Sequence, residues 1–350
     1  MGREIQQSEA CSGRHRCSIH CVMPPYVVEV LLKRAKSDSH REKLLNTLKL
    51  SAQNRGMRTA VSRLAFSKGA AEISIFDAHH SEDPSDAVLI WSESKPTELH
   101  DPDAVRVRDF TTATKNFYRE IFNRNSVDDN GLNLKSYIHF SDGWDNAQWD
   151  GSQMEYGDGD GVEFNSFTSS IDIVGHELTH GVTQYTSDLA YRGQSGALNE
   201  SFSDVMGSLI KQYQARQTVQ KADWLIGAGL FKNGDALRSM KKPGTAFEGD
   251  IQPVDMDGFV KTTRDHGGVH LNSSIPNRAF YEACVAFDPN LEAWKTIGPV
   301  WYAAFTRLSS HASFLAAARA TYVQAKHQSE KHADAVRAGW AAVKLDFARL

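Results

Sequence analysis

The sequence predicts an α+β protein with two domains, in which a half that mixes strands and helices precedes a mainly helical half. Three observations support this. The chain has 350 residues, 41% of them hydrophobic, which suits two domains of roughly 100–200 residues each. Before Ser170, short runs of β-forming residues alternate with helical patterns. After Ser170, apolar residues recur mostly at helical spacing.

A small helical unit is predicted in front of the mixed half. Residues 1–21 are mostly polar, and we interpret them as a disordered or loosely ordered tail. Met23-Pro24-Pro25-Tyr26 then fixes an extended segment, because proline restrains φ and disfavours helix in the preceding residue. Two helices are predicted at Val27–Leu32 and Arg41–Leu50, separated by Ser37-Asp38-Ser39.

The mixed half follows a basic and polar linker at Gln53–Gly69. Its strands and helix are predicted at Ile73–Phe76, Ala87–Trp91, Val105–Phe122 (the helix) and Leu134–Phe140. The segment Asp142–Gly161 is rich in Gly, Asp and Asn, and it is predicted as loop with a short edge strand at Gln153–Tyr156.

The helical half begins with a buried stripe formed by Ile171, Val174, Leu178 and Val182. Further helices are predicted at Gly196–Tyr213, Pro276–Phe287, Gly298–Leu308, Phe314–Lys326 and Lys331–Leu345.

Charge and hydropathy exclude several classes of protein. The net charge of −4 gives no basic excess for nucleic acid or an anionic membrane. No apolar run approaches the roughly 20 residues that span a bilayer, and residues 1–22 lack the apolar core of a Sec-type signal. We therefore expect a soluble protein that is cytoplasmic or exported by a non-classical route. Four cysteines are too few for a disulfide scaffold in this chain.

His176-Glu177-Leu178-Thr179-His180 is an H-E-x-x-H motif. Residues four apart lie one helical turn apart, so both imidazoles can bind one ion while Glu177 reaches a water on it. Glu200 follows on a second predicted helix as a third ligand. Two His, one carboxylate and an open position are typical of a catalytic zinc.

Further residues surround this pattern. Asp204 stands one turn beyond Glu200 and can accept the second N–H of a ligating histidine. In Asp265-His266-Gly267-Gly268-Val269-His270, the paired glycines permit a sharp turn that aims His270 into a cleft, with Asp265 to orient it. The alternatives are a solvated carboxylate for Asp204 and a packed or surface side chain for His270.

With these residues, the chain resembles the thermolysin-like neutral metallopeptidases, and specifically their protealysin-like branch, which has a short propeptide and no signal peptide. The matching stretches are Asn146–Trp149, Gly151–Gly161, His176–Gly181, Asn199–Asp204, Arg238–Met240 and Gly267–Asn272. The resemblance implies a propeptide and linker at residues 1–60, a catalytic α/β domain at 61–184 and a helical domain at 185–350, with the active-site cleft between the domains.

The resemblance also implies individual roles. Glu177 would be the general base and acid, and Tyr191 and His270 would stabilise the oxyanion, with Asp265 orienting His270. Asn199 and Asp204 would orient the ligating histidines. Asn146, the Ala147 carbonyl and Arg238 would bind the substrate backbone. Four apolar residues would line the pocket for the residue after the scissile bond, which predicts a hydrophobic preference; they are Phe164, Phe167, Ile173 and Leu237. Phe167 stands where many relatives have a smaller residue, so we expect a shallower pocket.

One departure concerns calcium. Lys211, Leu225 and Ala228 stand at family positions that are acidic, although Asp172 and Asp223 remain. An ammonium group is incompatible with a calcium site built from oxygen ligands. We therefore expect the double-calcium site to be absent, with Lys211 substituting for the ion by pairing with Asp172 or with the neighbours of Glu200.

The segment around Pro24-Pro25-Tyr26 resembles the short propeptide of the protealysin-like branch. We hypothesise that it lies in the cleft and blocks it until it is cut between about Leu45 and Gly69, in an exposed linker. A Cys21 thiolate at the open zinc position would silence the enzyme, and His20 could do the same. The interpretation we favour is that Cys17, His20 and Cys21 only pack or are solvated.

The sequence therefore predicts a zinc-dependent endopeptidase, a monomer, made as a zymogen and acting on proteins or peptides. Two other readings are a quiet protein that binds partners through a zinc-bearing cleft and a zinc hydrolase acting on a non-peptide substrate.

Overall fold

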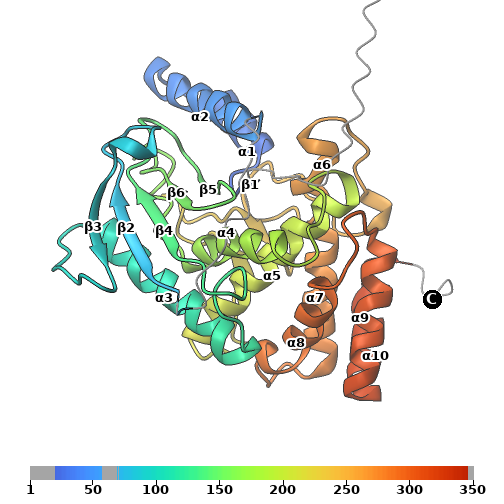
Figure 1. The fold of residues 1–350 in the computed structure, drawn as a ribbon. Coiled ribbons are helices and arrows are strands. Elements are labelled where there is room, and N and C mark those ends of the chain that lie inside the picture. Colours follow the sequence, from blue (N-terminus) through green and yellow to red (C-terminus); the bar gives the residue numbers. More distant parts are fainter. Residues whose placement is uncertain (1–19, 57–68, 70, 346–350) are drawn as a thin grey trace, which may run out of the picture.

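The computed structural model describes the chain from His20 to Leu345, apart from residues 57–68 and residue 70. Figure 1 shows two halves on either side of two crossed helices. One half carries the sheet and the other the C-terminal helices, and a pair of N-terminal helices lies across the top. Several predictions concern residues outside this description. They are the roles of Cys11 and Cys17 and the part of the predicted linker at residues 57–68.

The sheet of the first half has six strands in the order β1-β5-β6-β4-β2-β3. The strands β2, β4 and β6 run parallel to one another, and the other pairs are antiparallel. Helix α3 (Pro102–Phe122) contacts β2 and β4. The strand bounds are β1 His20–Cys21, β2 Ile73–Asp77, β3 Val88–Ser92, β4 Leu134–Ile138, β5 Ala147–Trp149 and β6 Met154–Tyr156.

Helices α4 (Ile171–Gln184) and α5 (Gly193–Gln214) cross between the two halves and are buried along most of their length. They approach closely at Gly207, where a Cβ atom would lie 2.5 Å from the Asp172 carbonyl oxygen. A larger residue there would push the helices apart. The second half also contains two short strands and five helices. They are β7 Leu225–Ile226, β8 Arg238–Ser239, α6 Asp265–Asn272, α7 Ser274–Phe287, α8 Ile297–Phe305, α9 Phe314–Gln328 and α10 Glu330–Ala342.

The N-terminal unit consists of α1 (Pro25–Arg34) and α2 (Asp38–Gly56). The break between them is at residues 35–37, and Ser37 caps α2 by accepting a hydrogen bond from the His40 N–H at 3.2 Å. The buried side chains of α1 join the main hydrophobic core.

The alternation of strands and helices agrees with the predicted fold class, but two interpretations of the sequence are wrong. Residues 1–21 do not all form a loose tail, because His20 and Cys21 form β1. The segment Asp142–Gly161 contains β5 as well as the expected β6, and β6 lies inside the sheet between β5 and β4 rather than at its edge. Both strands are too short to give a period-two pattern. No helix in the described ranges has the length and apolar character needed to cross a bilayer.

Candidate metal centre and cleft

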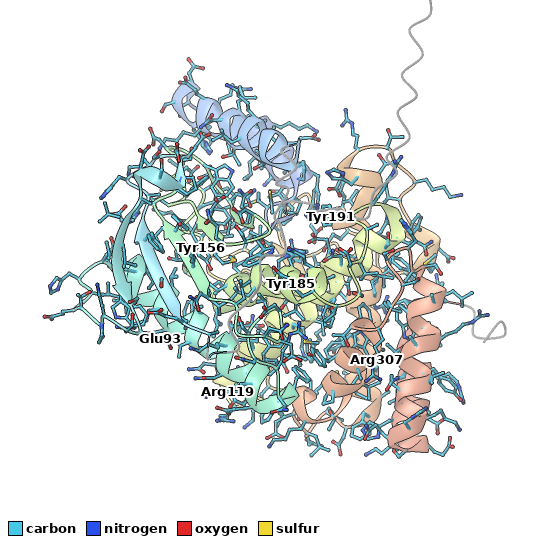
Figure 2. The ribbon with its side chains drawn as sticks, viewed as in Figure 1. Glu93, Arg119, Tyr156, Tyr185, Tyr191 and Arg307 are labelled. Atoms are coloured by element: carbon cyan, nitrogen blue, oxygen red, sulfur yellow. The ribbon has the colours of Figure 1, made fainter. Side chains whose placement is uncertain are left out.

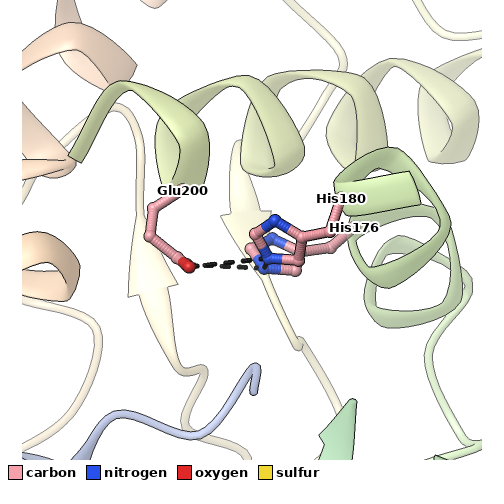
Figure 3. Close-up of side chains that lie close together, drawn as sticks. All are labelled: His176, His180 and Glu200. Atoms are coloured by element: carbon pink, nitrogen blue, oxygen red, sulfur yellow. Dashed lines mark hydrogen bonds and ion pairs between the residues drawn. The ribbon is translucent and has the colours of Figure 1, made fainter. Parts of the chain in front are cut away.

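The two crossed helices bring three potential metal ligands together (Figure 3). His176 and His180 lie one turn apart on α4, and Glu200 reaches them from α5. Their Nε2 atoms are 3.0 Å apart, and each lies 3.5 Å from an oxygen of Glu200. All three side chains are buried. Within the described part of the chain, they form the only group of three or more such residues that can share an ion.

The hydrogen bonds of the two imidazoles fit a cation at this point. His176 Nδ1 lies 2.9 Å from Asp204 Oδ1, and His180 Nδ1 lies 2.9 Å from Asn199 Oδ1. Both partners accept hydrogen bonds, so in each neutral imidazole the proton is on Nδ1 and the lone pair is on Nε2. Two lone pairs and a carboxylate then face one another. A divalent cation relieves this repulsion, and the His₂Glu donor set suits zinc.

Glu177 is rotated away from the ligands on the same helix. Its Oε2 atom accepts a hydrogen bond from the Trp149 N–H at 2.9 Å. Its Oε1 atom lies 4.0 Å from His176 Nε2 and is buried without a hydrogen-bond partner among the described residues. Burial raises the pKa of Glu177 to about 8, and His176 opposes the shift. One oxygen is thus anchored, and the other is available beside the cluster.

His270 lies on the other side of the cluster, on α6. Asp265 holds it by accepting hydrogen bonds from its Nδ1 at 2.6 Å and from its backbone N–H at 2.9 Å. His266, Gly267 and Gly268 have φ values of 50°, 89° and 77°, which makes the sharp turn expected for this motif.

His270 Nε2 faces the Tyr191 hydroxyl at 3.0 Å and Glu200 Oε2 at 3.6 Å. Figure 2 shows Tyr191 below α6, and its hydroxyl also donates to Glu200. Burial, strengthened by the Glu200 charge, raises the pKa of Tyr191 well above its ordinary value. The hydroxyl therefore remains protonated and can act as a donor.

Arg238 enters from β8 and forms a bidentate pair with Asp204, through Nε–Oδ2 at 2.9 Å and Nη2–Oδ1 at 2.8 Å. Asn277 Nδ2 donates to the same carboxylate at 2.8 Å. Asp204 therefore contacts both the His176 ring and Arg238. No pattern in the sequence indicates a role for Asn277 or for the Trp149 N–H, since each contributes through a contact that only the fold creates.

A segment of the chain itself occupies the cleft between these groups. The strand β1 pairs antiparallel with β5, with His20 opposite Trp149 and Cys21 opposite Gln148. The Val22 N–H donates to the Ala147 carbonyl at 3.1 Å, and the Met23 N–H donates to Asn146 Oδ1 at 2.9 Å.

Of the two interpretations of Cys21, the structure agrees with packing and not with binding of the thiolate to zinc. Cys21 Sγ lies 3.4 Å from Gln148 Oε1, and Cys21 does not belong to the metal cluster. Instead its backbone carbonyl lies 3.1 Å from His270 Nε2. Strand pairing determines this orientation, because it directs the backbone groups of β1 across the cleft. The His20 side chain and Cys17 fall outside the part of the chain described.

The four predicted pocket residues are all buried and belong to one hydrophobic cluster, which also contains Val22. The rings of Phe164 and Phe167 lie 5.6 Å apart. Leu237 and Ile173 both approach Gly227. The four side chains are therefore packed among other apolar residues, as the prediction requires.

Lys211 lies away from the metal cluster at the far end of α5. Its Nζ atom lies 2.9 Å from Asp172 Oδ2 and 2.9 Å from Asp223 Oδ1, and it donates to the Leu225 carbonyl at 2.6 Å. The predicted pairing of Lys211 with Asp172 is therefore confirmed. Burial would lower the pKa of Lys211, but the two carboxylates outweigh it and raise the pKa.

Comparisons with known proteins agree with this geometry. Residues 37–184 match the family model described as the thermolysin metallopeptidase catalytic domain, and residues 187–345 match that of its alpha-helical domain. An extracellular metalloprotease of Pectobacterium carotovorum is 38% identical over 93% of this chain and 96% of its own length. Protease PrtS of a Photorhabdus strain is 39% identical over 80% of this chain and 79% of its own.

The fold is also similar to the solved structure of a precursor protein. The protealysin precursor from Serratia proteamaculans superposes with a TM-score of 0.84 at 39% identity, over 93% of this chain and 100% of that one.

Proposed function

The chain belongs to the thermolysin family of metallopeptidases, and from this premise we propose that it is a zinc-dependent endopeptidase made as a zymogen, with Glu177 as its general base and acid. The observation that carries the proposal is the convergence of His176, His180 and Glu200 in a buried site beside Glu177. The metalloendopeptidase class follows from the family; the residue roles, substrate preference and latency are the proposal.

His176, His180 and Glu200 would hold the zinc. When bound, zinc acidifies a coordinated water and polarises the carbonyl to be cleaved. Asp204 and Asn199 orient the two imidazoles, and such outer contacts typically affect metal affinity by about 10–100-fold.

Glu177 would take a proton from the attacking water through its available Oε1 atom and later deliver it to the leaving nitrogen. The Trp149 N–H holds the other carboxylate oxygen at 2.9 Å and keeps Oε1 directed towards the cluster. A raised pKa suits this role, because a base near its working pH both accepts and returns the proton efficiently.

His270 and Tyr191 would donate to the oxygen on which negative charge develops. Asp265 and Glu200 together outweigh the effect of burial and raise the pKa of His270, so the imidazolium form is favoured. Fixed donors in a buried site stabilise developing charge without reorganisation.

The substrate backbone would bind Asn146, the Ala147 carbonyl and Arg238, as the segment from Cys21 to Met23 does. Phe164, Phe167, Ile173 and Leu237 would receive a hydrophobic side chain just after the scissile bond. Cleavage of a peptide library measures this preference, and a preference for charged residues at that position would contradict it.

The N-terminal unit would act as an intramolecular block of the cleft. Its extended segment binds the same backbone groups that a substrate needs, and α1 and α2 anchor it. Removal of the unit by a cut in the linker would release the active enzyme. Full-length E177Q protein should therefore bind a tight cleft-directed inhibitor far more weakly than E177Q protein that lacks residues 1–60.

The calcium proposal rests on Lys211, which would supply the positive charge between Asp172 and Asp223 in place of an ion. We also propose that the enzyme is a monomer. The relative named an extracellular metalloprotease supports export rather than a cytoplasmic location, and fractionation of the producing cells tests this.

Two experiments separate this function from its alternatives. Glu177→Gln should abolish peptide hydrolysis and retain zinc. Retained zinc with unchanged hydrolysis would contradict the role of Glu177. A wild-type protein that binds zinc but cleaves no peptide would favour the alternative of a partner-binding protein. A casein assay with and without a chelator tests the non-peptide hydrolase, against which the backbone-binding groups Asn146, Ala147 and Arg238 argue.

A further inference from the structure

We propose that the first bond this enzyme hydrolyses is its own Cys21–Val22 bond, in the same molecule. The inference rests on the proposed function and deepens it. It states that the blocking segment is bound as a substrate, in the direction and register that lead to cleavage, rather than as an inert plug.

The direction and register follow first from the Cys21 carbonyl. It accepts a hydrogen bond from His270 Nε2 at 3.1 Å, and that atom lies 3.6 Å from Glu200 of the metal cluster. This carbonyl therefore faces the groups that stabilise developing negative charge. The next backbone group, the Val22 N–H, donates to the Ala147 carbonyl at 3.1 Å. The peptide group between Cys21 and Val22 is thus held at both of its polar ends.

The residues that follow keep the same register. The Val22 carbonyl accepts from Arg238 Nη1 at 3.1 Å, and the Met23 N–H donates to Asn146 Oδ1 at 2.9 Å. A shift of one residue would turn these backbone groups to the opposite side of the segment and break the contacts. The segment therefore has a single register, with Cys21 before the attacked bond and Val22 after it.

The side chains permit cleavage at this bond. Val22 is aliphatic and fully buried within the main hydrophobic core, as a preferred residue after the scissile bond would be. The prolines stand later, at Pro24 and Pro25. Position 22 is not a proline, so the backbone N–H that donates to the Ala147 carbonyl is present.

The hydrolysis balances with water as the only co-reactant. The water oxygen adds to the Cys21 carbonyl carbon while Glu177 takes a proton from that water, and His270 donates a hydrogen bond to the carbonyl oxygen. The carbon–nitrogen bond then breaks as the proton passes to the Val22 nitrogen. The products are residues 1–21, ending in a carboxylic acid, and a chain that begins with an amine at Val22.

This cut would not by itself release the block. Helices α1 and α2 keep their own contacts with the two following domains. Arg34 Nη2 donates to the Glu248 carbonyl at 2.9 Å, and Asn46 Nδ2 donates to the Asp142 carbonyl at 3.0 Å. The shortened chain would still cover the cleft from Val22 onward. Activation would then have two steps, with the linker cut second.

The test starts from full-length protein that has been produced metal-free and is then given zinc. Intact mass and N-terminal sequencing should detect a chain beginning at Val22 before any cut in the linker. The rate constant of the cut at the Cys21–Val22 bond should not change with protein concentration, as expected for a reaction within one molecule. Val22→Asp should slow this cut by about tenfold or more, because an unpaired carboxylate would enter an apolar pocket, and Val22→Ile should preserve it.

A binding measurement provides a readout that does not depend on turnover. Calorimetry should detect binding of a synthetic peptide of residues 17–26 to zinc-loaded E177Q protein that lacks residues 1–60, with about tenfold or more weaker binding for its Val22→Asp form. The inference is overturned if zinc-loaded wild type keeps the Cys21–Val22 bond while the matured enzyme hydrolyses other peptides, or if the linker is always cut first. A matured enzyme that hydrolyses no peptide at all would overturn the proposed function as well.

Discussion

Asp204 and Arg238 form a buried bidentate pair, with both hydrogen bonds shorter than 3 Å. The same Asp204 carboxylate lies 2.9 Å from His176 Nδ1. One side chain thus orients a zinc ligand and the arginine that holds the Val22 carbonyl. The metal site and the backbone-binding site are therefore coupled through a single carboxylate.

We predict that Asp204→Asn weakens zinc binding by about 10–100-fold, because the amide cannot accept from His176 and pair with Arg238 as the carboxylate does. Zinc affinity measured with a competing chelator checks this. The same protein should also have a higher KM for peptides, since Arg238 loses its partner. Unchanged zinc affinity would show that His176 does not depend on Asp204 for its orientation.

We predict that Glu177→Gln lowers kcat for peptide hydrolysis by at least about 10²–10⁴-fold, the usual contribution of a general base. The zinc content should stay at one per chain, because Glu177 is not a ligand. Peptide turnover and metal analysis of the same sample measure both quantities. Loss of the zinc together with the activity would assign Glu177 to the metal cluster instead.

Lys211→Met should reduce the free energy of unfolding by about 3–5 kcal/mol, because it leaves Asp172 buried and without its ion-pair partner. Lys326→Met is the matched control, since it removes only an exposed pair with Glu330 and should change stability little. Denaturant unfolding compares the two. Equal effects would contradict the view that Lys211 takes the place of a calcium ion.

The docking of α2 should depend on pH through Asp145, which contacts Thr47 of that helix. Burial and the neighbouring Asp160 raise the pKa of Asp145 to about 8, against an ordinary value of 3.8. The docked state therefore holds this proton more tightly than a state in which Asp145 is exposed. Docking should be strongest below about pH 4 and should weaken as the pH rises towards 8.

The affinity of a peptide of residues 20–56 for E177Q protein lacking residues 1–60 measures this dependence. Asp145→Asn should flatten it. An affinity that rises with pH would refute the role given to Asp145.

Phe167→Val should change the residue preferred after the scissile bond towards larger aliphatic and aromatic side chains, because a smaller residue deepens the pocket that Phe164 and Phe167 share. Competition between peptides with Val and Phe at that position gives the ratio of kcat/KM values. A ratio that stays constant would remove Phe167 from the pocket.

Sequence patterns predicted the parts of the site that depend on local geometry. The i, i+4 spacing of His176 and His180 requires only a helix, and the helix exists. The turn at Gly267 and Gly268 was predicted because glycine readily adopts positive φ. Placement of Glu200 and Asp204 requires in addition that a second predicted helix packs against the first, and the structure contains that helix pair.

The sequence did not predict contacts between distant segments. The pairing of β1 with β5 joins Cys21 to Gln148 and leaves no periodic pattern in either segment. For the same reason the sequence suggests only two roles for Cys21, a thiolate on zinc or a packed side chain, whereas the strand pairing presents its backbone carbonyl to His270. The Trp149 N–H that anchors Glu177 is likewise a backbone group, which has no signature in the sequence.

The central claim is that two imidazoles and one carboxylate hold a single zinc ion and leave it one position for water. Anomalous diffraction at the zinc edge from crystals of the matured protein tests it most directly. We expect one strong anomalous-difference peak at about 2.0–2.2 Å from His176 Nε2, His180 Nε2 and a Glu200 oxygen. A peak elsewhere, or a zinc ion enclosed by four protein ligands in the matured enzyme, would contradict it.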